Sequence, residues 1–472
     1  MKNTLLTLLS SAVLLTSCSN QKEDAPASDN MEPKVVSVEH PSWAKSASIY
    51  EVNIRQHTAE GTIAEFTKDI DRLADMGITI LWIMPVQPIG VEGRKDPDST
   101  GAAMGSYYSI SDYTAIAPEY GDMDDFKAMV DTAHSRGMKV ILDWVANHTA
   151  FDHHWVTEHL DYYTLTDEGV PSVAQNQDGS LTDWTDVADL NYDNKELHQA
   201  MTDEMLWWID QADIDGFRCD VAGYVPIEFW RFSTAQIREK KSDAFMLAEW
   251  DEPYLHEVFD MTYGWDFHHR TNEVAKGEQS ALSFDEYRDS VLLPKYPEEA
   301  MKMLFTTNHD ENSWNGTVYE RYGDAHEVFF VLCATYTNGM PLIYSGQEAG
   351  LNHRLRFFYK DTVDWTVNPL LQDFYATSIQ MKHDNPALWN GQWGGEQVKI
   401  TTTSDSAVYA FYREVDGNTV AVFLNLSGEQ VAFDYSNMPV GMYEEVYSGS
   451  MVEMKSEDSM ELTPWGYMVF VK

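Results

Sequence analysis

Ionisable side chains directly follow apolar runs at four places in this 472-residue chain. The four segments read Asp143-Trp144-Val145-Ala146-Asn147-His148, Gly216-Phe217-Arg218-Cys219-Asp220, Leu247-Ala248-Glu249-Trp250 and Thr306-Thr307-Asn308-His309-Asp310-Glu311-Asn312. Burying a carboxylate is costly unless it is paired or takes part in chemistry. One such segment would fit a structural salt bridge, but four together are hard to explain by packing. We therefore predict a catalytic site.

Two of these carboxyl groups have the properties that cleavage of a glycosidic bond requires, which are one ionised and one protonated carboxyl. Asp220 lies two residues after Arg218, so both side chains point to the same side of a strand. The guanidinium should keep Asp220 ionised, as a nucleophile requires. Glu249 has no cation beside it in sequence, and the apolar Trp250 would raise its pKa and suit it to proton donation. An ordinary ion-pair partner is the alternative for Glu249, and sequence spacing alone does not reject it.

Two residues of the fourth segment fit the same chemistry. His309 and Asp310 would hold sugar hydroxyls, and Asp310 would favour the distorted ring of a transition state.

Amphipathic helical segments alternate with apolar strand segments along the first 390 residues. Ile63, Phe66, Ile70 and Leu73 share one helical face before the apolar run at 78–85, and the same order returns before 138–145. This alternation indicates parallel strands covered by helices. The predicted strands are 48–55, 78–86, 138–145, 214–221, 244–249, 261–266, 301–307 and 341–345. Eight such strands in about 350 residues favour an α/β fold, the (β/α)8 TIM barrel, whose strands end at the active site.

The composition changes twice along the chain. A polar, Gly- and Asp-rich stretch interrupts the alternation after the third strand, and short β-rich runs follow Trp389. Val415-Asp416-Gly417-Asn418 is typical of a hairpin turn. We predict the following domains: the barrel at 41–148 and 194–390, an inserted B-type domain at 149–193, and a C-terminal antiparallel β-sandwich at 391–472.

The N-terminus has the pattern of an export signal. Lys2 precedes the apolar run Leu5 to Leu15, which is too short to span a membrane. Residues 15–18, Leu-Thr-Ser-Cys, resemble a bacterial lipoprotein cleavage site. That resemblance implies removal of residues 1–17, lipidation of Cys18, a flexible tether at 18–40 and a lipid-anchored place in the bacterial cell envelope, at the outer membrane, facing the periplasm or the outside. An ordinary signal with a chance cysteine is the alternative.

The net charge limits the partners. Asp and Glu number 76 against 32 Lys and Arg, which gives a formal net charge of -44. Such a surface repels phosphates, which argues against nucleic acid and against membrane contact other than the lipid anchor. It does not repel a neutral glucan. A disulfide between Cys219 and Cys333 is compatible with the sequence, but two buried small residues are the simpler interpretation. The sequence does not indicate an oligomeric state.

The four segments resemble the conserved regions of the α-amylase superfamily, which are retaining α-glycoside hydrolases on a TIM barrel. DWVANH, GFRCD, AEW and TTNHDEN occur in the family's order, and the resemblance extends from about residue 45 to 472. It implies that Asp220 is the nucleophile, Glu249 the general acid/base and Asp310 the stabiliser of the transition state.

The same resemblance implies the substrate-binding residues. Arg218 matches the arginine beside the nucleophile, and His148 and His309 match histidines that bind sugar hydroxyls. Tyr108 resembles the tyrosine that stacks on the cleaved sugar, with Tyr107 as the alternative.

The chain departs from the family after the nucleophile. Many α-amylases have a Lys-His pair there, whereas Asp220 is followed by Val221-Ala222-Gly223-Tyr224. Contacts to the leaving group from that pair are missing, which puts endo action in doubt. Asn147 and Asp189 match two ligands of the family's structural calcium ion, so bound calcium is an expectation. No organic cofactor is expected.

The sequence thus predicts an enzyme that hydrolyses α-1,4-glucosidic bonds in starch-like glucans or maltooligosaccharides. The mechanism would retain the anomeric configuration through a covalent glycosyl-enzyme. Two alternatives remain: an α-glucan transglycosylase, and a non-catalytic glycan-binding protein on the same fold.

Overall fold

A computed structural model describes residues 35–366 and 368–472. The predicted signal peptide, Cys18 and the first part of the predicted tether lie outside the described residues. The lipidation site and the tether therefore stay predictions.

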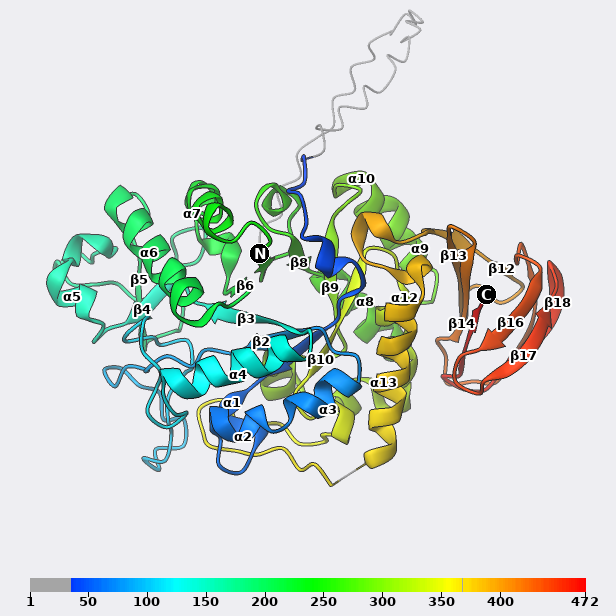
Figure 1. The fold of residues 1–472 in the computed structure, drawn as a ribbon, viewed down its shortest axis with the longest axis horizontal. Coiled ribbons are helices and arrows are strands. Elements are labelled where there is room, and N and C mark those ends of the chain that lie inside the picture. The colour runs from blue at the N-terminus through cyan, green and yellow to red at the C-terminus, as the bar shows by residue number, and fades with distance from the viewer. Residues whose placement is uncertain (1–34, 367) are drawn as a thin grey trace, which may run out of the picture. The chain divides into compact units, whose positions relative to one another are not determined.

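Eight parallel strands close into a barrel (Figure 1). Around the barrel they follow the order β1-β10-β9-β8-β7-β6-β3-β2. Their bounds are β1 Ile49–Val52, β2 Ile80–Ile83, β3 Lys139–Trp144, β6 Gly216–Cys219, β7 Phe245–Ala248, β8 Met261–Tyr263, β9 Met301–Leu304 and β10 Gly339–Tyr344. The predicted TIM barrel is confirmed. Except for β10, which begins earlier, the strands are shorter than predicted, and the ionisable residues at their carboxyl ends, such as Asp220 and Glu249, lie just beyond them.

Helices surround the barrel in Figure 1. Their bounds are α1 Ile54–His57, α2 Ile63–Thr67, α3 Ile70–Asp75, α4 Met123–Ser135, α6 Lys195–Ala212, α7 Ile227–Lys240, α8 Trp265–Ala275, α9 Ser283–Tyr287, α10 Leu293–Lys295, α11 Val318–Tyr322, α12 His326–Thr335 and α13 Pro369–Asp384. The local sequence determines where several of these helices begin. Asp122 and Asp125 form a capping box at α4, and the Asn194 side chain caps α6.

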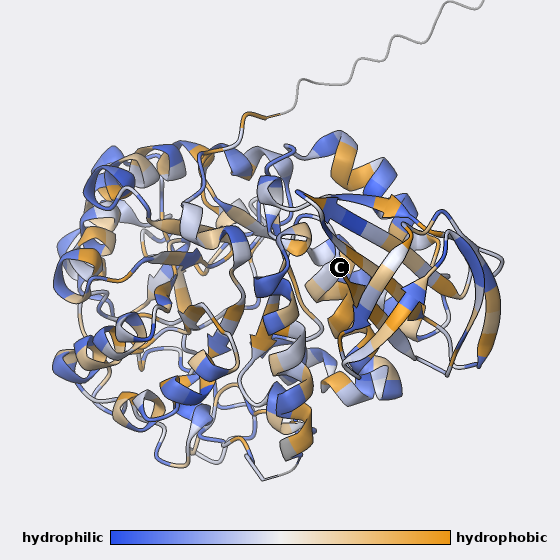
Figure 2. Ribbon diagram, turned by 45° about the vertical axis from the view of Figure 1, so that its right-hand side comes forward, coloured by the Kyte–Doolittle hydropathy of each residue, from blue (hydrophilic) through white to orange (hydrophobic). Residues whose placement is uncertain are grey.

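Hydrophobic and hydrophilic residues alternate along the helix ribbons in Figure 2, as expected of helices with one buried and one exposed face. The predicted helix around Ile63 to Leu73 is divided into α2 and α3, yet Ile63, Phe66, Ile70 and Leu73 are all buried. The helical face predicted from their spacing is therefore present.

The segment after β3 leaves the barrel before α6 begins. It contains α5 His154–Glu158 and a two-stranded antiparallel sheet of β4 His148–Ala150 and β5 Val187–Asp189. This is the predicted insertion, and we call residues 149–193 the excursion.

The C-terminal region is antiparallel, as predicted. One sheet has the order β11-β13-β14-β19-β16-β17 and the other β12-β15-β18. The bounds are β11 Glu396–Lys399, β12 Thr401–Thr402, β13 Val408–Val415, β14 Asn418–Asn425, β15 Val431–Ser436, β16 Gly441–Glu445, β17 Ser450–Met454, β18 Glu457–Leu462 and β19 Tyr467–Val471. Asp416 and Gly417 both have positive φ, 52° and 86°, which suits the predicted hairpin turn between β13 and β14.

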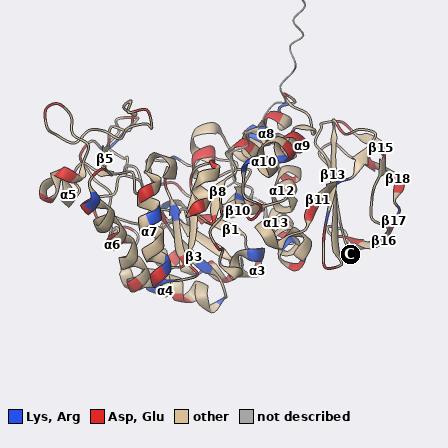
Figure 3. Cartoon of the chain, turned by 90° about the horizontal axis from the view of Figure 1, so that it is seen from above, with Lys and Arg blue, Asp and Glu red and all other residues tan. Residues whose placement is uncertain are grey.

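Asp and Glu positions are spread over the elements in Figure 3, and the sequence has 76 of them against 32 Lys and Arg. Cys219 and Cys333 are both buried and free, which confirms the simpler interpretation of these two residues. Among the described residues, no helix is long and apolar enough to cross a membrane.

Candidate active site

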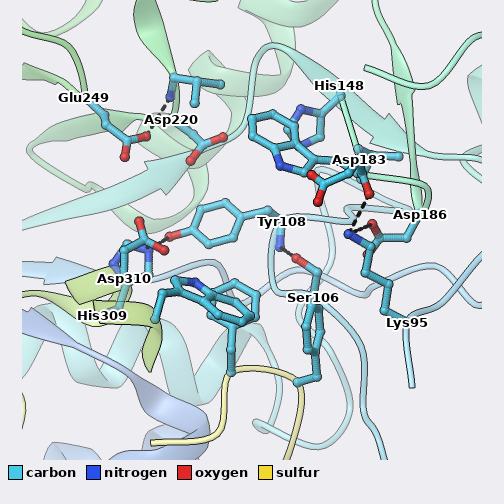
Figure 4. A pocket seen from close by; sticks show the side chains of 16 residues that line it. Lys95, Ser106, Tyr108, His148, Asp183, Asp186, Asp220, Glu249, His309 and Asp310 are labelled. Atoms are coloured by element: carbon cyan, nitrogen blue, oxygen red, sulfur yellow. Dashed lines mark hydrogen bonds and ion pairs between the residues drawn. The ribbon is translucent and has the colours of Figure 1, made fainter. Parts of the chain in front are cut away.

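The ionisable residues that follow β3, β6, β7 and β9 meet at one cavity of about 500 Å³ (Figure 4). Asp220 and Glu249 come from the neighbouring strands β6 and β7, and His309 and Asp310 follow β9. The cavity is lined by Lys95, Ser106, Tyr108, His148, Asp183, Trp184, Asp186, Val187, Asp220, Val221, Glu249, His309, Asp310, Trp314, Phe357 and Phe358. The four sequence segments therefore converge at the carboxyl end of the barrel, as this fold predicts.

Arg218 lies fully buried beneath this cavity and contacts three carboxylates. Its Nη1 lies 2.8 Å from Asp143 Oδ1 and 2.9 Å from Asp220 Oδ1. Its Nη2 lies 2.8 Å from Glu249 Oε2. The predicted pair of Arg218 and Asp220 is present. Glu249 has no cation beside it in sequence, but the Arg218 guanidinium reaches it from the adjacent strand.

Burial dominates the pKa values of the two central carboxyls. It raises the pKa of Asp220, and the ion pair with Arg218 offsets this only in part. The guanidinium favours the ionised form of Asp220, as expected, but burial, which the sequence did not show, opposes it. Burial also raises the pKa of Glu249 against the pull of Arg218, and the charges of Asp220 and Asp310 raise it further. The direction for Glu249 is the one expected of a proton donor.

The backbone after the nucleophile position is bent toward Glu249. The Val221 N–H donates a hydrogen bond of 2.8 Å to Glu249 Oε2. Val221 has a φ of 36°, in the left-handed region that a β-branched residue rarely occupies. Such strain is often found at functional sites. In this protein the strained conformation of Val221 directs its N–H at Glu249, the carboxyl expected to transfer protons.

His309 forms the opposite side of the cavity floor. Its Nδ1 lies 2.5 Å from Glu51 Oε1, and its Nε2 lies 2.8 Å from the Tyr108 hydroxyl and 3.2 Å from Asp310 Oδ2. Burial opposes a charge on this ring, but the Asp310 and Glu51 carboxylates outweigh it and raise the pKa of His309 to about 9. His309 is therefore a cation at neutral pH and donates through both ring nitrogens.

Tyr108 and Tyr107 are separated by the structure. Tyr108 lines the cavity, and its hydroxyl donates to Asp143 Oδ2 at 3.2 Å. Tyr107 points elsewhere: its hydroxyl accepts from Asn53 and its ring packs under the Arg55 guanidinium. Of the two candidates for a stacking tyrosine, only Tyr108 lies at the site.

His148 also lines the cavity, beside the ring of Trp184. Burial lowers the pKa of His148 to about 4, so the ring is neutral at pH 7. A neutral imidazole at His148 and a charged one at His309, on different sides of the cavity, give the site both a hydrogen-bond acceptor and donors for sugar hydroxyls.

The two predicted calcium ligands lie near the β4–β5 ladder. Asp189 Oδ1 already accepts from the Gln175 N–H at 3.0 Å, and Asn147 Nδ2 contacts His148 Nδ1 at 3.1 Å. The described residues hold no group of three or more His, Cys, Asp or Glu side chains fit for a metal ion. Calcium takes six to eight oxygens, so backbone carbonyls and water would have to complete the set. The calcium site stays a prediction, and no step of the proposed mechanism depends on it.

Several residues of the cavity were missed in the sequence. Phe357 and Phe358 lie in the loop after β10, and Trp184 lies in the excursion, where no periodic pattern or motif marks them. Trp314 follows Asp310 by four residues, so its closeness to the fourth segment was an available signal. Glu51, fully buried at the end of β1, resembles any other strand residue until its partner His309 is known.

Comparison with known proteins agrees with this geometry. Residues 44–392 match the family described as alpha amylase, catalytic domain, and residues 398–469 match the maltogenic amylase C-terminal domain. The chain belongs to the alpha-amylase family and is, by family, a glycoside hydrolase.

Two relatives illustrate the range of the family. The chain is 27% identical over 408 residues to "Alpha-amylase MalA" of Haloarcula japonica, covering 82% of this chain and 56% of that protein. It is 27% identical to "Neopullulanase 2" of Thermoactinomyces vulgaris, covering 83% and 71%. Among solved structures, it resembles the maltogenic alpha-amylase AmyB from Thermotoga neapolitana with a TM-score of 0.80 and 26% identity, over 91% of this chain and 99% of that one.

Proposed function

We propose that this protein hydrolyses α-1,4-glucosidic bonds in starch-like glucans or maltooligosaccharides with retention of configuration. The observation that carries the proposal is that Asp220 and Glu249, on adjacent strands, face one cavity and share Arg218. A nucleophile and a proton donor on either side of one bond are what the retaining reaction requires. The names of the relatives, among them alpha-amylase and neopullulanase, support an α-glucan as the substrate.

The first chemical step would form a glycosyl-enzyme. The Asp220 carboxylate attacks the anomeric carbon while the bond from that carbon to the leaving oxygen breaks. Glu249 gives its proton to this oxygen, so the leaving sugar departs as an alcohol. Positive charge develops on the sugar ring in the transition state. Asp310, at the same cavity, would stabilise that charge.

The second step would return the enzyme to its starting state. Glu249, now ionised, takes a proton from water, and the water oxygen bonds to the anomeric carbon as the bond to Asp220 breaks. Two inversions at one carbon give net retention. The charged His309, the neutral His148 and the ring of Tyr108 would hold the sugar during both steps.

The test measures reducing sugar released from soluble starch and from maltoheptaose, with proton NMR recording the first anomer formed. We expect release from both substrates and the α-anomer first. No release from any α-glucan by folded protein would remove the proposal, and a β-anomer formed first would remove retention.

Glucan transfer is the second candidate, and one observation favours it. Where many relatives have Lys-His, Tyr224 packs against Trp250 at 5.2 Å and is stacked on Trp184 at 6.2 Å between ring centroids. Aromatic faces beside Glu249 would bind an acceptor sugar in place of water. Chromatography of the maltoheptaose products decides: oligosaccharides longer than the substrate indicate transfer.

We also propose that the protein is lipid-anchored in the bacterial cell envelope. Support comes only from the sequence around Cys18. Labelling of the expressed full chain with a radioactive fatty acid tests this, and Cys18→Ala should abolish the label. A wild-type chain that takes up no label would contradict the anchor.

A further inference from the structure

We propose that the enzyme acts on the non-reducing ends of glucan chains, because loops close the cavity at the end that receives the non-reducing side of the substrate. This inference rests on the proposed function, since it takes Glu249 as the proton donor.

The barrel order fixes which end is closed. In the order β1-β10-β9-β8-β7-β6-β3-β2, β1 lies four strands from β7 in either direction, so the two are opposite each other. Glu249 follows β7 and would protonate the leaving oxygen, which places the leaving part of the substrate on that side. The sugar bonded to Asp220 and any residues beyond it therefore extend toward β1. Its neighbours β2 and β10 carry the loops that matter, residues 84–122 and 345–366.

These two loops join above β1. The Met104 N–H donates to the Phe358 carbonyl at 2.7 Å, Arg356 Nη2 lies 2.7 Å from Asp98 Oδ2, and the Tyr359 hydroxyl donates to Asp96 Oδ1 at 3.1 Å. We call these three contacts the bridge. The Phe357 and Phe358 side chains line the cavity directly beside it.

The closure continues from the bridge in both directions. Toward the excursion, Lys95 Nζ donates to the Asp183 carbonyl at 3.0 Å and lies 3.8 Å from Asp186 Oδ1. Toward β9, the Trp314 ring packs against Phe357 and Phe358, with centroids 5.2 and 5.9 Å apart. In Figure 4, Lys95 and Ser106 lie across the cavity from Glu249. Together with the bridge, these contacts run along one side of the cavity from the excursion to the loop after β9. We call this side of the cavity the wall.

The side next to Glu249 is different. Between β8 and α8 there is only Gly264, so no loop rises from the strand between β7 and β9. A Cβ at Gly264 would lie 2.7 Å from Leu304 Cδ2, so this connection is also tightly packed. On the β6 side of Glu249 the excursion contacts the loop after β6, through Gln177 Nε2 to the Gly223 carbonyl at 2.5 Å and the Tyr224 hydroxyl to Asn176 Oδ1 at 3.1 Å. The leaving part of a long chain would therefore extend over the β8 side, whereas the side at β1 has the bridge.

A chain that enters such a cavity must do so by its non-reducing end. On this proposal an internal bond does not reach Asp220, because the part of the chain beyond the bonded sugar would have to pass through the bridge. The product is then one short sugar of constant length, released from the chain end.

The test uses a matched pair of maltoheptaoses with a fluorescent label at the reducing end. In one, the non-reducing residue is free; in the other, an acetal joins its O4 and O6. Chromatography follows the labelled products from the earliest time points. We expect the free substrate to give one labelled product first, and the blocked substrate to react at least about 10²-fold more slowly, because a misplaced bond costs that much.

Variants of the bridge test the wall itself. Arg356→Ala with Tyr359→Phe removes the ion pair to Asp98 and the hydrogen bond to Asp96. The matched control is Arg354→Ala, which removes a similarly exposed pair with Glu320, at 2.7 Å, on the same loop but outside the bridge. The rate ratio of blocked to free substrate should rise in the bridge variant, by at most about fivefold for each of these two interactions, since exposed pairs contribute little. The control should leave this ratio unchanged.

Comparable rates on both substrates, with labelled products of many lengths, would overturn the inference and leave the proposed hydrolysis intact. An unchanged ratio in the bridge variant would overturn the assignment of the wall to these interactions. No cleavage of either substrate or of unlabelled maltoheptaose would overturn the proposed function, and this inference with it.

Discussion

Two aspartates at opposite ends of β6 have opposite surroundings. Asp215 precedes the strand and is surrounded by donors: His134 at 2.7 Å, Lys139 at 2.9 Å, Lys241 at 3.1 Å and the Val140 N–H at 2.9 Å. Burial opposes its ionisation, yet these donors hold the pKa of Asp215 far below its usual range. Asp220 follows the strand and shares one guanidinium with two other carboxylates.

The number of donors around each aspartate distinguishes a carboxylate that stabilises the fold from one that reacts. A buried carboxylate with more donors than it needs is fixed in one protonation state and stabilises the fold. A buried carboxylate with too few donors has a raised pKa and is reactive. At the two ends of β6, the same type of side chain stabilises the fold at Asp215 and serves chemistry at Asp220.

The largest effect is expected at the reactive end. Asp220→Asn should lower kcat by roughly 10⁴-fold or more, as loss of a nucleophile does. Because its pKa is raised in the fold, ionised Asp220 destabilises the protein near neutral pH, so the variant should unfold at the same urea concentration or higher. Near-full activity would show that another group is the nucleophile. Calorimetry with maltoheptaose should still detect binding.

At Asp215 we expect a loss of stability without a loss of activity. Asp215→Asn leaves Lys139 and Lys241 without their carboxylate and removes the partner of His134, and breaking such a buried cluster should cost about 3 kcal/mol of unfolding free energy. Urea denaturation measures this cost, and kcat of the folded variant should be unchanged. A variant as stable as the wild type would mean that Asp215 is not the centre of this cluster in solution.

The pH dependence should separate activity from stability. A lowered pKa in the fold means that the contribution of Asp215 to stability is present above the unfolded carboxyl pKa and is lost only as pH falls through its folded value, in strong acid. Asp220 must be ionised to react, and its pKa is raised, so kcat/KM should fall at milder acidity while circular dichroism is unchanged. Glu249 must be protonated, so activity should also fall as pH rises through its raised pKa. Activity and ellipticity lost together in acid would contradict this separation.

The smallest effect concerns Asp189, whose surroundings are intermediate. Burial raises its pKa, and the Gln175 N–H offsets this only in part. The calcium prediction implies that EDTA lowers the melting temperature by a few degrees, that calcium restores it, and that Asp189→Asn abolishes the response. Identical melting curves with and without EDTA would remove calcium from this protein.

The sequence predicted the barrel and its central residues for a common reason. Apolar runs and helical spacing are visible in short stretches of sequence and indicate which residues are buried. They were therefore enough to predict the strands and the ionisable groups that follow β3, β6, β7 and β9. What could not be read depends on contacts between distant residues. Arg218 next to Glu249 is a cross-strand contact, and the buried Glu51 is explained only by His309. The bridge joins loops some 250 residues apart, and no local pattern reports such pairing.

The sharing of Arg218 limits how this site can change by mutation. Its guanidinium contacts Asp143, Asp220 and Glu249, so exchange of any one carboxyl redistributes the single positive charge over the other two. The effects of paired substitutions should therefore deviate from the sum of the single ones. A substitution at one of these four residues would then require compensating substitutions at the others. We therefore expect the four positions to change together in evolution.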